Sequence, residues 1–387
     1  MSNVRPIKIG SQNVSCNEGD LAMMRLYGIR NLRSWLLMAF LFLAGSASAG
    51  PCTTAESACT EWVTVAGGPS RLLVYRTYPL EARNDAITKA LVMVHGQGRD
   101  ADNYFRHALA GAFLANALED TLVLAPRFAS NFGTNCRDTL APNELNWNCL
   151  QAPEGWRVGG PAIDNGKIAS FDAIDEILRK LARKELFPNL RGIVVAGHSG
   201  GGQFVQRYQL TNRVHESLGV VISYAVANPS SYAYLDSLRP TQSAVPLDVA
   251  AASPGYIPPP PAKPPAPFLP FADARNCTAY DEWPYGLTKR TGYVARLTDD
   301  ELKKQLAARP TTYLLGELDI LPLYGFDSSC SAGAQGPTRL ARGLAYARYA
   351  NQLHGAQHKT LVVAACGHSA RCMFTADPAL LVIFPKQ

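Results

Sequence analysis

The sequence predicts an α/β fold in which a mostly parallel sheet carries helices on both faces. Short apolar runs, typical of buried strands, recur along residues 60–375. Segments with apolar residues at helical spacing lie between them, and this alternation requires the crossovers that build parallel sheets. A third observation is the stretch 191–208, where an apolar run, a glycine-rich turn and an amphipathic segment follow one another directly. With 387 residues, 47% of them hydrophobic, the chain is long enough to bury a sizeable core.

The first 49 residues are expected to be a secretory leader. Basic residues precede an apolar block at 35–44, and small residues follow it. This order is typical of a signal peptide, cleaved here after Ala49, and the apolar block is too short for a permanent membrane span. The first 22 residues lengthen the basic region, which favours a translation start at Met23 or Met24. An uncleaved anchor is the alternative.

Cleavage would leave residues 50–387 as a single secreted or periplasmic domain with no stable membrane span. It would remove five basic and two acidic side chains, so the formal net charge would fall from +6 to +3. So mild a charge gives no reason to expect a nucleic-acid partner.

Cysteine content agrees with export, because eight of the nine cysteines lie in the mature chain. Eight cysteines allow about a hundred pairings, and nearness in sequence favours one of them. The favoured pairs are Cys52 with Cys59, Cys136 with Cys149, Cys366 with Cys372, and Cys277 with Cys330. Metal binding is the rival interpretation, but no C-x-x-C or paired Cys/His spacing supports it, so no metal is predicted.

The first elements of the mature chain predict a sheet edge followed by a βαβ unit. Two strand-like runs, 61–66 and 71–77, flank Gly and Pro residues and predict a hairpin at the edge. An apolar strand at 89–95, a helix at 102–118 and a strand at 121–126 follow.

Residues 127–165 are irregular and predict a long loop that is either functional or stapled. Trp147 and Trp156 in this loop are candidates to line a substrate cleft, and packing beneath the loop is the alternative. A helix over 167–186 follows, with apolar side chains at helical spacing.

The turn Gly197-His198-Ser199-Gly200-Gly201 is a G-x-S-x-G motif between a predicted strand and a predicted helix. This context produces a sharp turn that exposes the serine hydroxyl. Glycine is required on either side because a side chain would collide in so tight a turn. The alternative is a glycine-rich helix start that Ser199 merely caps.

After a strand at 218–225, residues 228–296 break the alternating pattern. The proline-rich run 258–265 can neither continue a helix nor donate to a sheet. We expect 228–296 to be an insertion over the catalytic face, a lid or specificity loop, and a disordered linker is the alternative. Trp283, near its end, is a further candidate for substrate binding.

The sheet pattern resumes once more and places two polar residues after strands. Asp319 follows the strand 311–316, and His368 follows the strand 360–365, with a helix at 338–354 between them. Acyl transfer needs a nucleophile, a base and a carboxylate that orients the base. Ser199, His368 and Asp319 are the candidates for these roles. Glu317, two residues before Asp319, is the alternative acid.

The motif and the order Ser, Asp, His along the chain resemble the α/β-hydrolase superfamily over most of residues 60–375. Within it, the chain looks most like secreted, mostly uncharacterised bacterial and fungal hydrolases. The resemblance implies an α/β-hydrolase fold, with the oxyanion bound by the backbone N–H groups of Gly200 and of Gln97 in the loop after His95. The chain departs from lipases with an HGGG loop, because Gln97 replaces a glycine.

These residues predict an exported serine esterase that works through an acyl-enzyme and needs no cofactor. Its substrate is expected to be a small-molecule or polymeric carboxylic ester. A serine peptidase or amidase would use the same residues, and a noncatalytic binding protein on the same scaffold is the alternative of another class. Arg99 would bind an anionic substrate group or serve as a salt-bridge partner in its loop.

Overall fold

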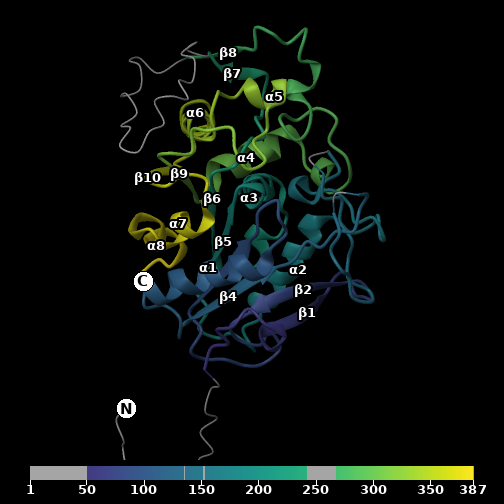
Figure 1. Ribbon diagram of the computed structural model, residues 1–387, viewed down its shortest axis with the longest axis vertical. Helices are drawn as coiled ribbons and strands as arrows, with labels where there is room; N and C mark the ends of the chain where they lie inside the picture. The colour runs from purple at the N-terminus through teal and green to yellow at the C-terminus, as the bar shows by residue number, and fades with distance from the viewer. Residues whose placement is uncertain (1–49, 135, 151–152, 242–266, 387) are drawn as a thin grey trace, which may run out of the picture. The chain divides into compact units, whose positions relative to one another are not determined.

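The computed structural model describes residues 50–134, 136–150, 153–241 and 267–386 (Figure 1). The expected signal peptide and the proline-rich run 258–265 lie outside these residues. Within the described ranges, no helix is long and apolar enough to cross a membrane.

The strands of the central sheet run close to their predicted positions. They are β1 (Thr60–Thr64), β2 (Arg71–Arg76), β3 (Lys89–Val94), β4 (Thr121–Pro126), β5 (Gly192–His198), β6 (Val221–Ala227), β9 (Thr311–Gly316) and β10 (Lys359–Val363). The sheet has eight strands in the order β1-β2-β4-β3-β5-β6-β9-β10. The six from β4 to β10 pair in parallel, and the antiparallel hairpin β1-β2 forms one edge. The predicted mostly parallel sheet is confirmed, and the hairpin at its edge with it.

Helices cover both faces of this sheet (Figure 1). The helices are α1 (Ala101–Leu114), α2 (Ser170–Leu181), α3 (Gly200–Thr211), α4 (Asp299–Ala308), α5 (Cys330–Gly333), α6 (Arg339–His354), α7 (Ala370–Thr375) and α8 (Asp377–Ile383). Buried side chains of α1, α7 and α8 form the core on one face, and those of α2, α3, α4 and α6 belong to the core on the other.

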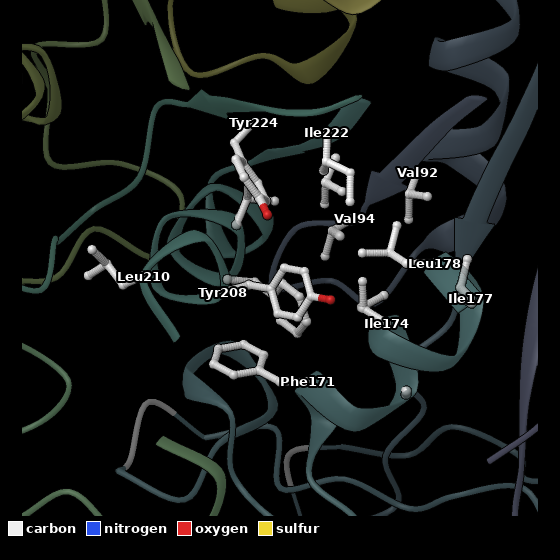
Figure 2. Packing of buried hydrophobic residues seen from close by; sticks show 14 of the residues in the cluster. Val92, Val94, Phe171, Ile174, Ile177, Leu178, Tyr208, Leu210, Ile222 and Tyr224 are labelled. Atoms are coloured by element: carbon white, nitrogen blue, oxygen red, sulfur yellow. The ribbon is translucent and has the colours of Figure 1, made fainter. Parts of the chain in front are cut away.

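Alternation along β3 shows how one strand serves both cores. Leu91 and Met93 belong to the core beneath α1 and α7, whereas Val92 and Val94 belong to the core beneath α2 and α3. Successive side chains of a strand point to opposite faces, so a strand buried on both sides is apolar throughout. Figure 2 shows the second core at close range, where Val92 and Val94 lie among aliphatic and aromatic side chains from the helices and from β6. The labelled neighbours are Phe171, Ile174, Ile177, Leu178, Tyr208, Leu210, Ile222 and Tyr224.

Four helices were not predicted from the sequence: α4, α5, α7 and α8. A signal for α4 is nevertheless present, because Thr298 accepts from the backbone N of Glu301 while the Glu301 carboxylate accepts from the backbone N of Thr298. This reciprocal capping box has the pattern T-x-x-E. The helix α8 has a proline in its first turn, the position that proline tolerates best.

All four predicted cysteine pairs are disulfide bonds in the structure. The pair Cys277–Cys330 joins the described end of segment 228–296 to α5. The pair Cys366–Cys372 closes the loop that carries His368. Two of the four bonds therefore constrain segments that follow the sheet strands near its carboxyl edge.

The described parts of segment 228–296 pack onto the main domain. Tyr232 and Tyr234 are fully buried and contact Tyr346 of α6 through their rings. Arg239 is also buried and lies over the ring of Tyr234. Within this segment, β7 (Leu238–Pro240) pairs with β8 (Phe268–Pro270) in a two-stranded sheet. Residues 242–266 lie outside the description, so a lid over the catalytic face stays a prediction.

Burial of histidines makes the stability of this protein depend on pH. Desolvation lowers the pKa of five imidazoles. The pKa falls to about 4 in His95, His215 and His358, well below the usual value in His198, and below it in His107. In the unfolded chain an imidazole has a pKa near 6.5. Below about pH 6.5 the unfolded chain therefore binds more protons than the native state does. Burial of Asp175 acts in the opposite direction, because it raises the pKa of that carboxyl to about 6.

We therefore expect the free energy of unfolding to fall as the pH is lowered from about 6.5 to about 4. Each excess proton taken up by the unfolded chain contributes a slope of about 1.4 kcal/mol per pH unit. Denaturant midpoints at stepped pH would measure this slope, and His358→Gln, which removes one of the titrating groups, should flatten it. A stability that stays constant or increases on acidification would contradict the expectation.

Candidate active site

Ser199 lies at the sharp turn between β5 and α3. Its backbone has φ 58° and ψ −117°, a region that residues other than glycine rarely occupy. The turn is possible because a side chain on Gly201 would collide with the carbonyls of Val94 and His95, and one on Gly197 would collide with Gly201 itself. Ser199 makes no capping hydrogen bond through its side chain, so the alternative role as a helix cap is wrong.

The structure brings Ser199, His368 and Asp319 together at the carboxyl edge of the sheet, where β5, β10 and β9 end. The Ser199 Oγ lies 2.9 Å from Nε2 of His368, and Nδ1 of His368 lies 2.7 Å from Oδ2 of Asp319. A carboxylate only accepts hydrogen bonds, so the proton of the neutral ring is on Nδ1. Nε2 is then left with a lone pair that accepts from the serine hydroxyl. The alternative acid, Glu317, instead accepts from the backbone N of Ala365.

A buried arginine pairs with the carboxylate of Asp319. Nη1 of Arg339, at the start of α6, lies 3.4 Å from Oδ1 of Asp319, and both side chains are almost fully buried. Nη2 of Arg339 donates to the carbonyls of Leu323 (2.8 Å) and Tyr324 (3.0 Å). A buried charge is tolerated when it is paired and hydrogen-bonded, so this arginine offsets the cost of burying the carboxylate. The sequence contains no signal for it, since a basic residue at a helix start is usually solvated.

The backbone N–H of Gln97 lies beside Gly200, as the predicted oxyanion site requires. A Cβ added to Gly200 would lie 3.0 Å from the backbone N of Gln97 and 3.0 Å from Cδ of Arg157. A side chain at position 200 would therefore crowd the loop that carries Gln97, which glycine leaves free to approach. Arg157 is buried, and its Nη2 has no hydrogen-bond partner among the described residues.

His95 holds the loop that carries Gln97 through its own side chain. Nδ1 donates to the carbonyl of Gly96 at 2.8 Å, and Nε2 accepts from the backbone N of Phe128 at 3.0 Å. Its imidazole is fully buried and is thus used for positioning. Arg99 in the same loop pairs with Asp138 at 2.6 Å, which is the salt-bridge role given as one of its two alternatives.

Asn228 connects the ends of β9 and β5 with the loop that carries His368. Its Oδ1 accepts from the backbone N of Gly316 at 2.7 Å, and its Nδ2 lies 3.4 Å from Nε2 of His198 and 3.5 Å from the carbonyl of Gly367. Asn228 is fully buried and has a positive φ of 44°. This residue could not be predicted from the sequence, because its partners come from three separate strands or loops.

A cavity of about 400 Å³ opens beside these residues. Its lining includes Gln97, Ser199, Tyr324 and His368, and none of its lining residues comes from the described parts of 228–296. Among the residues that the structure describes, no group of three or more His, Cys, Asp and Glu side chains is arranged to hold a metal ion.

The three tryptophans proposed as substrate-binding residues are core residues. Trp147 and Trp156 have no exposed surface, and Trp283 is 3% exposed. Trp156 stacks on Phe128 with ring centroids 5.2 Å apart, and the indole N–H of Trp283 donates to the carbonyl of Val158. The prediction that they line a substrate cleft is wrong, because large aromatic rings gain more free energy from full burial beneath the loop.

Comparison with known proteins places these features in a family context. Residues 91–382 match the sequence profile described as the alpha/beta hydrolase family. Among solved structures, the poly(3-hydroxybutyrate) depolymerase LpqC from Bordetella parapertussis is similar with a TM-score of 0.52 and 19% identity, over 82% of this chain and 85% of that one. The poly(aspartic acid) hydrolase-1 from Sphingomonas sp. KT-1 is similar with a TM-score of 0.53 and 20% identity, over 84% of this chain and 98% of that one. At such identities the likeness extends to the fold alone. No curated protein matches the sequence.

Proposed function

Because the chain belongs to the alpha/beta hydrolase family, we propose that it is an exported serine hydrolase that cleaves carboxylic esters through an acyl-enzyme. The observation that carries the proposal is the continuous hydrogen-bond chain from Ser199 through His368 to Asp319. Each member has the role that its chemistry allows: nucleophile, general base and orienting carboxylate.

In the first half of the reaction, the Oγ of Ser199 attacks the ester carbonyl while Nε2 of His368 takes the hydroxyl proton. Asp319 holds Nδ1, so the imidazolium that forms is stabilised and keeps its orientation. The negative oxygen of the tetrahedral intermediate is bound by the backbone N–H groups of Gln97 and Gly200. One such donor typically contributes about 3 to 4 kcal/mol to transition-state stabilisation.

Collapse of the intermediate breaks the bond to the alcohol oxygen, which leaves with the proton from Nε2. In the second half, His368 deprotonates a water molecule, the water attacks the acyl-enzyme, and Ser199 recovers its proton as the acid is released. Atoms balance over the cycle: one ester and one water give one acid and one alcohol.

Export and the breadth of the substrate are further parts of the proposal. Four disulfide bonds favour an oxidising compartment, and so support secretion or a periplasmic location. Polymeric esters are included among the substrates, because a protein of similar fold is a poly(3-hydroxybutyrate) depolymerase. The second candidate is an amidase or peptidase that uses the same residues. It is kept because another protein of similar fold is named a poly(aspartic acid) hydrolase, and poly(aspartic acid) is joined by amide bonds.

A fluorophosphonate probe tests the proposal directly, because it reacts with an activated serine. The mature protein, residues 50–387, should be labelled, Ser199→Ala should not be, and Ser217→Ala, which changes an exposed serine on the 3₁₀ helix His215–Ser217, should label like the unchanged protein. Protein that has not been treated with the probe should hydrolyse p-nitrophenyl esters faster than the matched amides. A folded protein with a normal circular dichroism spectrum that resists the probe would overturn the assignment, and faster amide turnover would favour the second candidate.

A further inference from the structure

Tyr324 is a large aromatic side chain left in solvent at the catalytic cavity. It is 75% exposed, yet it lines the same cavity as Ser199 and His368. Its ring is nearly parallel to the His368 imidazole, with an interplanar angle of 13° and centroids 6.3 Å apart. At this distance the ring lies beside His368, and both residues line the open cavity.

The loop that carries Tyr324 is held in one conformation at some cost. Tyr324 has a positive φ of 51°, a strained conformation for a bulky residue, and Gly325 follows with a φ of 68°. Arg339 fixes the strained segment by donating to the carbonyls of Leu323 and Tyr324. The same arginine pairs with Asp319, so one buried group positions both the orienting carboxylate and the exposed ring.

Folding alone explains neither the strain nor the exposure of this ring. An aromatic side chain in water contributes little to the core, and asparagine or glycine would occupy a positive φ with less strain. Leu323, the preceding residue, is 47% exposed as well. Of these two side chains, Tyr324 lines the cavity, and an exposed aromatic ring at a cavity is a surface that an apolar ligand can cover.

The proposed reaction decides which part of the substrate meets this ring. Nε2 of His368 must deliver its proton to the alcohol oxygen as the carbon–oxygen bond breaks, so the alcohol leaves beside the imidazole. The ring of Tyr324 lies next to that same imidazole. The acyl part stays bonded to Ser199 at this step, so it is the alcohol part that lies beside the imidazole and the ring of Tyr324.

We propose that Tyr324 is the binding platform for the alcohol part of the ester, and that the preferred alcohols are aromatic or otherwise large and apolar. This inference rests on the proposed function. It assigns selectivity for the alcohol to the loop after β9, whereas the sequence analysis expected substrate recognition from tryptophans and from segment 228–296.

Two series of esters test the platform. One series keeps an acetyl group and varies the alcohol from methyl to hexyl, phenyl and naphthyl, and the other keeps a phenyl alcohol and varies the acyl chain. The quantity compared is the ratio of kcat/KM between variant and unchanged protein for each ester, which cancels differences in intrinsic reactivity. Tyr324→Ala should lower kcat/KM about ten-fold for the phenyl and naphthyl esters and less than about two-fold for the methyl ester.

Three controls separate a platform from a general structural effect. Tyr324→Phe keeps the ring and should retain activity on all esters to within about two-fold. Phe113→Ala removes an equally exposed aromatic side chain, 74% exposed on α1, and should change nothing. The rate of acyl-enzyme hydrolysis should be unaltered in Tyr324→Ala, because the alcohol has already left.

An equal loss for every alcohol, or a loss that varies along the acyl series, would overturn the platform. Fluorophosphonate labelling keeps this failure distinct from failure of the proposed function. If the unchanged protein and Tyr324→Ala both react with the probe but the alcohol series is flat, only the platform is wrong. If neither reacts, the serine hydrolase assignment fails first.

Discussion

Ser199→Ala should lower ester turnover by about six orders of magnitude, the loss typical of removing the nucleophile from a serine triad. The methyl group cannot form an acyl-enzyme, and the oxyanion donors and the binding cavity that remain accelerate only direct attack by water. The fold should survive. The change removes the hydrogen bond between Ser199 Oγ and His368, and it leaves the hydrogen bond between His368 and Asp319 in place.

The free energy of unfolding of a second variant, Ser199→Gly, tests whether the backbone of Ser199 is strained. Ser199 has a backbone conformation that only glycine adopts freely. Ser199→Gly should therefore abolish turnover and raise the free energy of unfolding by about 1 kcal/mol. Steady-state assays together with denaturant titrations would show both effects, with Ser217→Gly as the matched control. Residual turnover above about 1% in Ser199→Ala would assign the chemistry to another group.

Asp319→Asn should lower kcat by about four orders of magnitude, as the equivalent change does in serine proteases. The asparagine amide can donate to Nδ1 of His368, which moves the ring proton to Nε2 and leaves no lone pair for the Ser199 hydroxyl. Here the change has a second effect, because it removes the negative partner of Arg339. Leaving a buried charge without its partner typically costs about 3 to 5 kcal/mol, so the variant should also be markedly less stable.

A double variant separates the two effects of Asp319. Asp319→Asn combined with Arg339→Met removes both buried charges and should recover much of the stability without recovering turnover. Glu317→Gln is the matched control two residues away, and it should retain activity because its carboxylate contacts the backbone of Ala365. Thermal unfolding and kcat measured on all three proteins give the comparison. Recovery of turnover in the double variant, or loss of it in Glu317→Gln, would assign the orienting carboxylate elsewhere.

The positions of the strands and of the residues that follow them were predictable from the sequence. Apolar runs such as 193–195 are local patterns, and the order of strand, turn and helix around Ser199 is local too. Because parallel strands end at the same edge, residues after β5, β9 and β10 were expected to meet there, and the structure places Ser199, Asp319 and His368 within hydrogen-bond distance. Their catalytic roles are the proposal that the experiments above test.

Burial and long-range pairing were decided only by the tertiary structure. A tryptophan in a long loop has the same local pattern whether it lines a cleft or fills a core, and Trp156 fills the core. Arg339 and Asn228 act through partners from distant strands and loops, which no local pattern records. The position of the Tyr324 ring beside His368 likewise depends on the fold and has no local sequence pattern. Sequence alone thus determined the elements and the chemical groups at their ends, because these depend on neighbours along the chain. Only folding determined which side chains surround those groups, because these depend on neighbours in space.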